Sequence, residues 1–212
     1  MKKYFLLTLT FAITFSPFAQ TNKTHLVGEY YLMNLPEVGS GFQINEDSSF
    51  VFFLSYGAMD RQTEGKWHLE ENNIVFNSNN KSKQSFLLEK EEQNNDQQIL
   101  IQFSNTNKLM NKYLSAMLFS NGNKLMEKAN DEGKIIFPAI KVDTIVLFFD
   151  WCPDKQSTFI PSNANNNKFT FSPLNTLMDV VFDELKMKLN DNNMSGRLPF
   201  WDEKELQFKK MK

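Results

Sequence analysis

Residues 28–76 read GEYYLMNLPEVGSGFQINEDSSFVFFLSYGAMDRQTEGKWHLEENNIVF. Apolar and polar residues alternate along this stretch with the period of two that a half-buried β-strand requires. In the segment 64–70, for example, Trp67 and Leu69 fall on one face and His68 falls on the other. Short polar turns separate the runs, and connections this short join antiparallel neighbours. The stretch therefore predicts an antiparallel meander.

The same alternation continues beyond residue 76, interrupted by polar stretches at 77–83 and 89–98. About six short strands are expected between the second polar stretch and residue 165, and Asn121-Gly122 is the strongest hairpin signal among them. That number of strands suits a small sandwich. The predicted fold is all-β, a lipocalin-like antiparallel β-barrel or meander with a second small β-sandwich. Its expected parts are an N-terminal meander at 25–90, a sandwich at 98–165 and C-terminal strands at 168–212 that return to the first part.

The pieces GEYYL, GFQINEDSSFVFFLSYGAMD and EGKW follow one another between Gly28 and Trp67. In that order they resemble small exported lipocalin-like β domains of the calycin type, whose function is uncharacterised. The resemblance implies a calycin-type barrel and no particular activity, because the residues that carry it are structural. The segment NDEGKIIF at 130–137 resembles part of immunoglobulin-like or transthyretin-like modules.

The N-terminus has the pattern of a signal peptide. Lys2 and Lys3 precede an apolar run from Tyr4 to Phe15, and the small residue Ala19 follows. A dozen apolar residues form roughly 18 Å of helix, too short to cross a ~30 Å hydrocarbon core. We therefore expect residues 1–19 to be removed, leaving a periplasmic or extracellular protein without a membrane span.

Charge and cysteine content narrow the function classes. The chain carries 23 Lys and Arg against 25 Asp and Glu, so a strongly basic face for nucleic acid is not expected. Cys152 is the single cysteine and cannot form an intramolecular disulfide. It follows the apolar run 145–149, which favours a buried, inert thiol.

Catalytic groups are sparse. A Ser or Cys nucleophile needs a nearby base, usually His, and only His25 and His68 are available, one near the N-terminus and one on the outer face of its strand. No Gly-rich phosphate loop follows a strand, and no Cys and His cluster has zinc spacing. We therefore assign no catalytic residue, no metal ligand and no cofactor. A pair of carboxylates of the glycosidase kind remains an alternative. Its candidates are the acidic residues near aromatic residues in the sequence, namely Asp60, Glu64, Asp150 and Asp154.

The C-terminal part carries two ambiguities. Residues 174–185 fit a helical stripe while alternation favours strands over 180–189. The segment that begins at Asp191 and reaches Asp202 at the twelfth place matches part of a calcium-binding loop, although the usual twelfth ligand is Glu. A polar turn between two strands is the favoured interpretation.

The best binding candidate is the loop 55–61, which concentrates an aromatic, an acidic and a basic side chain. The expected ligand-binding residues are Tyr56, Asp60, Arg61 and Trp67. In the alternative interpretation, the two aromatic residues complete the core and the two charged residues face solvent. The predicted function is a non-catalytic binding or interaction module for an unknown small molecule or envelope protein. A hydrolytic enzyme, using carboxylates or a Cys and His pair, and a structural envelope protein are the alternatives.

Overall fold

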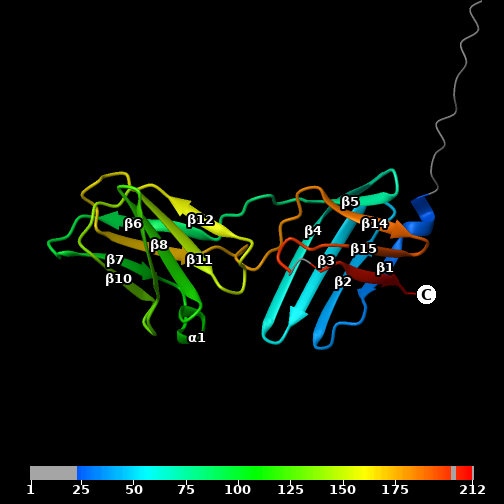
Figure 1. The fold of residues 1–212 in the computed structure, drawn as a ribbon, viewed down its shortest axis with the longest axis horizontal. Coiled ribbons are helices and arrows are strands. Elements are labelled where there is room, and N and C mark those ends of the chain that lie inside the picture. The colour runs from blue at the N-terminus through cyan, green and yellow to red at the C-terminus, as the bar shows by residue number, and fades with distance from the viewer. Residues whose placement is uncertain (1–22, 202–203, 212) are drawn as a thin grey trace, which may run out of the picture.

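A computed structural model describes residues 23–201 and 204–211 of the 212-residue chain. The expected signal peptide, residues 1–19, lies outside the described residues. The structure is all-β, as predicted, and consists of a barrel and a sandwich that lie side by side (Figure 1). A short 3-10 helix, η1 (Lys23–Leu26), precedes the first strand. In the described part of the chain, no helix has the length and apolarity needed to cross a membrane.

The barrel is closed by eight antiparallel strands, which agrees with the lipocalin-like expectation at the level of architecture. The first five strands form the predicted meander, and three C-terminal strands complete the circle between the first and the fifth. In spatial order the strands are β1 (Gly28–Leu32), β16 (Leu206–Lys210), β15 (Asn193–Gly196), β14 (Leu185–Asn190), β5 (Asn73–Ser78), β4 (Met59–Glu70), β3 (Ser49–Tyr56) and β2 (Val38–Ile44).

The interior of the barrel is filled by its own aromatic side chains. Phe42 lies at the centre, with ring centroids 4.6 Å from Phe76, 4.8 Å from Phe52 and 5.1 Å from Phe208. Phe182 comes from outside the barrel strands and stacks on Phe42 at 6.0 Å. All five rings are fully buried. The lumen is therefore occupied by the core of the barrel itself.

The sandwich consists of two four-stranded sheets that share one hydrophobic core. One sheet has the order β10 (Lys134–Pro138), β7 (Gln98–Phe103), β13 (Lys168–Pro173) and β6 (Phe86–Glu92), with β13 parallel to β7. The other has the order β12 (Gln156–Phe159), β11 (Thr144–Phe149), β8 (Leu114–Ser120) and β9 (Asn123–Lys128). A single turn of helix, α1 (Lys108–Asn111), precedes β8.

Two strands lie on the other side of the expected boundaries. β6 was expected in the N-terminal part and β13 among the strands that return to it, but both belong to the sandwich. β13 lies between β6 and β7, and its alternating Phe169 and Phe171 are buried in the sandwich core. Alternation identifies a strand but does not identify its neighbours. β13 is therefore a strand, as predicted, but it pairs with sandwich strands and not with the barrel.

Turns behave as their residues predict. Asn121 and Gly122 have positive φ angles of 48° and 79° and close the β8–β9 hairpin. Asp191, with φ of 53°, lies in the turn of the β14–β15 hairpin, which is the favoured interpretation of the calcium-like segment. Asp202 lies outside the described residues. Over 174–189 the chain first turns, where the backbone N–H of Leu177 bonds back to the carbonyl of Leu174, and it becomes a strand only from Leu185 rather than from residue 180.

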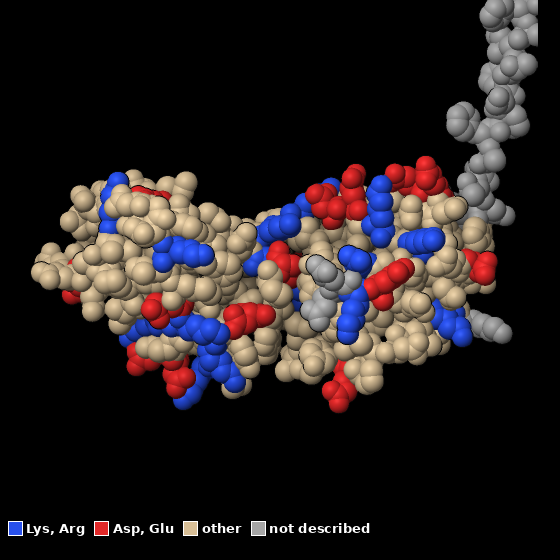
Figure 2. Space-filling view, viewed as in Figure 1, with Lys and Arg blue, Asp and Glu red and all other residues tan. Residues whose placement is uncertain are grey.

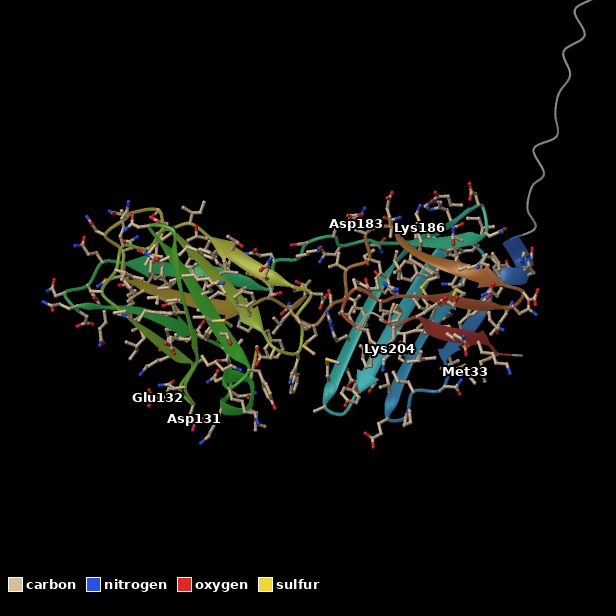
Figure 3. The ribbon with its side chains drawn as sticks, viewed as in Figure 1. Met33, Asp131, Glu132, Asp183, Lys186 and Lys204 are labelled. Atoms are coloured by element: carbon tan, nitrogen blue, oxygen red, sulfur yellow. The ribbon has the colours of Figure 1, made fainter. Side chains whose placement is uncertain are left out.

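The sandwich is inserted into the barrel between β5 and β14. Two crossing segments, residues 79–85 and 174–184, connect the bodies and lie beside each other (Figure 1). Leu174 donates its backbone N–H to the carbonyl of Ser85, and Lys81 binds Asp183 at 2.6 Å. Asp183 stands at the barrel end of the crossing (Figure 3). The two crossing segments thus form the junction of the molecule.

Candidate functional site

Arg61 on β4 ties the barrel to the sandwich. Its side chain is 1% exposed and forms a bidentate ion pair with Asp154, with Nη1 2.7 Å from Oδ1 and Nη2 2.9 Å from Oδ2. Nε and Nη2 also donate to the backbone carbonyls of Met178 and Asp179, each at 3.3 Å. The guanidinium lies 4.8 Å from the ring centroid of Phe200. One side chain thus holds β4, the loop after β11 and a crossing segment in a fixed arrangement.

Two further reactive groups are buried next to this ion pair. Lys155 is buried and donates its Nζ to the backbone carbonyl of Thr176, and burial lowers the pKa of its ammonium group. Cys152 is also buried, with its Sγ 3.8 Å from Sδ of Met178, and burial raises the pKa of its thiol to about 11. The thiol is therefore protonated at neutral pH and shielded from reagents.

A groove opens on the surface above Arg61, and we call it the junction groove. It consists of one hollow of about 360 Å³ and one of about 410 Å³, and Gln62 and Asp179 line both. β3 and β4 supply one wall and the crossing segments supply the other. The first hollow is lined chiefly by Val51, Glu64, Asn79, Asn80 and Thr176, and the second by Phe53, Asp60, Arg61, Asn175 and Met178.

Backbone pairing fixes the walls of the junction groove. The N–H of Val180 donates to the carbonyl of Gln62 at 2.9 Å, which attaches the crossing segment to β4. The N–H of Asn79 donates to the carbonyl of Glu64 at 3.0 Å, which attaches the other crossing segment to the same strand. The side-chain amide of Asn79 also lies 3.4 Å from Oε1 of Glu64. The polar side chains of the groove therefore project from a backbone in which both crossing segments are hydrogen-bonded to β4.

Carboxylates and amides dominate the lining of the groove. Asp60, Glu64 and Asp179 supply the carboxylates, and Arg61 is the one basic residue among the described lining residues. The Arg61 charge is compensated by Asp154, whose side chain is 8% exposed. Elsewhere, acidic and basic side chains lie side by side over both bodies on the face shown in Figure 2. The groove thus offers hydrogen-bond acceptors and neutral donors rather than a free cation.

An aromatic platform adjoins the groove on the outer face of the barrel. Tyr31, Gly41 and Phe53 are neighbours in register on β1, β2 and β3. The two rings meet edge to face with centroids 6.0 Å apart, and each side chain is 38% exposed. A Cβ on Gly41 would lie 2.9 Å from the Phe53 ring and 2.6 Å from the Tyr30 carbonyl, so only glycine leaves room for this arrangement. Val51, two residues from Phe53, is 40% exposed and extends the platform into the groove.

The four residues expected to bind a ligand are divided among three places. Asp60 and Arg61 line the junction groove, with Arg61 buried beneath it. Tyr56 is exposed at the β3–β4 hairpin, with its ring 6.1 Å from that of Trp201. Trp67 is buried in the barrel core and donates its indole N–H to the carbonyl of Asn45 at 3.1 Å, so it does not reach the groove. Alternation places Trp67 on the same face as Leu69, which is partly buried and packs against the barrel core.

Sequence reasoning missed most of the groove. Gln62 and Glu64 point outward on a strand that was predicted correctly, but nothing in their spacing distinguishes them from other solvated residues. Asn79 belongs to the polar stretch 77–83, which was noticed only as a change in composition. Asp179 is more than 100 residues from β4 in the sequence and reaches the groove because the neighbouring Val180 donates its backbone N–H to the Gln62 carbonyl.

Within the part of the chain that the structure describes, the side chains that a metal site or a Cys and His pair would need do not lie together. Among the described residues, no three His, Cys, Asp or Glu side chains are grouped so that they could hold a metal ion. His68 is exposed on β4, whereas Cys152 has no exposed surface. Comparison of the chain with family models, with curated proteins and with solved structures yields no match.

Proposed function

We propose that the protein is an exported, non-catalytic binding module with a lipocalin-like barrel, and that it holds its ligand in the junction groove rather than in the barrel lumen. The observation that carries this proposal is that two hollows meet across Gln62 and Asp179, directly above the buried Arg61–Asp154 ion pair. Binding sites are commonly found where two bodies of a protein meet.

The filled lumen supports a ligand site outside the barrel. Five buried Phe rings occupy the space in which a hollow barrel would hold a ligand. The junction groove, in contrast, is open to solvent and has walls fixed by backbone hydrogen bonds. A site whose groups are held in place before binding loses little conformational entropy when the ligand arrives. The hydrogen-bonded walls of the junction groove therefore favour ligand binding there.

The state of the reactive groups supports a non-catalytic role. Cys152 is buried with a raised pKa, which disfavours the thiolate that nucleophilic catalysis needs. The ammonium of Lys155 is occupied by the Thr176 carbonyl. Export is proposed from Lys2, Lys3 and the apolar run that follows them.

The proposal can be tested by blocking the groove. Gln62→Trp places a large ring where the two hollows meet, and Gln207→Trp makes the same change at an exposed position on β16. A small-molecule library is screened by thermal shift on the wild type and both variants. We expect compounds that raise the Tm of the wild type and of Gln207→Trp but not that of Gln62→Trp. Compounds that stabilise all three proteins equally would contradict a ligand site in the groove.

A further inference from the structure

We infer that the ligand of the junction groove is a neutral oligosaccharide whose sugar rings lie on the Phe53 platform and whose hydroxyl groups reach the amides of the groove. This inference rests on the proposed function, since it names the class of ligand for the same site. It is carried by three features of the groove, namely its charge, its mixture of donors and acceptors, and the aromatic platform beside it.

The charge of the groove argues against an anionic ligand. Asp60, Glu64 and Asp179 line it, and the guanidinium of Arg61 is buried and committed to Asp154. A phosphate or an acidic sugar would meet carboxylates without an available cation to compensate its charge. The ligand is therefore neutral or cationic.

The amides distinguish between these two classes. Gln62 and Asn175 each present an NH₂ donor and a carbonyl acceptor to the groove. The Asn79 amide already donates to Glu64, and the Asn80 carbonyl already accepts from the Ser82 N–H. An ammonium or guanidinium ligand only donates, so it would use the acceptors and leave the NH₂ groups without a role. A hydroxyl group both donates and accepts, so a ligand rich in hydroxyls uses both halves of the Gln62 and Asn175 amides. The lining therefore favours a neutral polyhydroxylated molecule.

The platform provides the apolar half of the match. A pyranose ring has a face of C–H bonds and an edge of hydroxyl groups, so it requires an apolar surface next to a polar one. Phe53 and Val51 offer that surface and also line the two hollows, while Tyr31 extends it across Gly41. Burial of the C–H face against an exposed ring is favourable because both surfaces leave water. An oligosaccharide is long enough to cover the platform and the groove together.

The test uses isothermal titration calorimetry with the purified protein and defined probes. The neutral probes are cellohexaose, maltohexaose, xylohexaose and chitohexaose, and the charged probes are an oligogalacturonate and hexalysine. We expect at least one neutral hexasaccharide to bind, with an affinity that changes little between low and high salt. Phe53→Ala and Gln62→Ala should each weaken that binding by about 10-fold, as loss of a central contact does.

Matched variants separate loss of binding from loss of structure. Phe53→Tyr keeps the ring and should keep the affinity, whereas Ile136→Ala and Gln207→Ala alter exposed residues away from the groove and should change nothing. Failure of every neutral hexasaccharide overturns the carbohydrate inference. If hexalysine binds instead, and Gln62→Trp blocks it, the groove remains a binding site and only the ligand class is wrong. If a hexasaccharide binds equally to Phe53→Ala and Gln62→Ala, both this inference and the proposed site are wrong.

Discussion

Arg61 and Asp154 are 93 residues apart in the sequence and share two parallel hydrogen bonds of 2.7 and 2.9 Å at the junction of the barrel and the sandwich. Arg61 belongs to β4, and Asp154 belongs to the loop between β11 and β12. Their contact holds the barrel and the sandwich, which are otherwise joined by the two crossing segments, in the arrangement that forms the junction groove. Because both charges are buried, each depends on the other for compensation.

Removing either partner should destabilise the protein strongly. Arg61→Ala leaves the Asp154 carboxylate without its partner, and Asp154→Ala leaves the guanidinium without its own. We expect each to lower the free energy of unfolding by about 3–5 kcal/mol, as breaking a buried ion pair does. Urea unfolding followed by circular dichroism measures the change. Lys186, which is labelled in Figure 3, forms an exposed pair with Glu70, and Lys186→Ala should cost less than about 1 kcal/mol. Equal losses in all three variants would contradict the structural role of the junction pair.

Cys152 should resist thiol reagents in the native protein and react quickly once urea unfolds the chain. The pKa of the buried thiol is raised from 9.0 to about 11, so between these values the unfolded chain loses its proton before the native one does. Stability should therefore fall as the pH rises from about 9 to about 11. Unfolding curves across this range measure the effect, and Cys152→Ala should show a smaller fall. Rapid labelling of the native protein at neutral pH would show that the thiol is accessible.

Gly41 should be intolerant of any side chain, in contrast to Gly39 on the same strand. A Cβ at Gly41 would lie 2.6 Å from the Tyr30 carbonyl, whereas at Gly39 the nearest atom is the Cβ of Ser55 at 3.9 Å. We therefore expect Gly41→Ala to lower the Tm clearly and Gly39→Ala to lower it little, because only the first must displace backbone and the Phe53 ring. Thermal unfolding measures both. A similar Tm for the two variants would show that the sheet can relax around Gly41.

Replacement of Phe42 should destabilise the barrel more than replacement of any other of its aromatic rings. It contacts five other aromatic rings, including Phe76 at 4.6 Å and Phe182 at 6.0 Å. Phe42→Ala should cost about 3–5 kcal/mol and leave an apolar cavity. Such a cavity stays dry and binds small aromatic molecules, so benzene should raise the Tm of the variant but not that of the wild type. Absence of this difference would mean that the neighbouring rings collapse into the space. Leu87→Ala, an exposed change on β6, is the matched control.

Local patterns predicted much of this fold because they act through neighbouring residues. Alternation of apolar and polar residues predicted β1 to β5. Asn121-Gly122 predicted the β8–β9 hairpin because its turn requires positive φ angles, which Asn and Gly adopt readily. The partners of β13 were wrong because pairing is decided by packing between distant segments. Phe169 and Phe171 fit a buried face in either body, and only the assembled core selects the sandwich.

The candidate site was harder to predict for the same reason. Arg61 was identified as a binding residue because the loop 55–61 concentrates an aromatic, an acidic and a basic side chain, yet its guanidinium is buried and paired with Asp154 across the junction. No feature near Arg61 in the sequence indicates that partner. Gln62 and Asp179 form the centre of the groove, but they are ordinary polar residues until the crossing segment is attached to β4 through the backbone of Val180.

The insertion of the sandwich between β5 and β14 also sets an order of events during synthesis. All strands of the sandwich lie within residues 86–173, so they emerge from the ribosome before the last three barrel strands. Until residues 185–210 follow, β1 to β5 form an open sheet with two unpaired edges, and unpaired edges invite aggregation. The barrel closes only when β16 reaches β1, where Lys210 lies opposite Tyr30. The C-terminal strand thus completes the part of the protein that is made first.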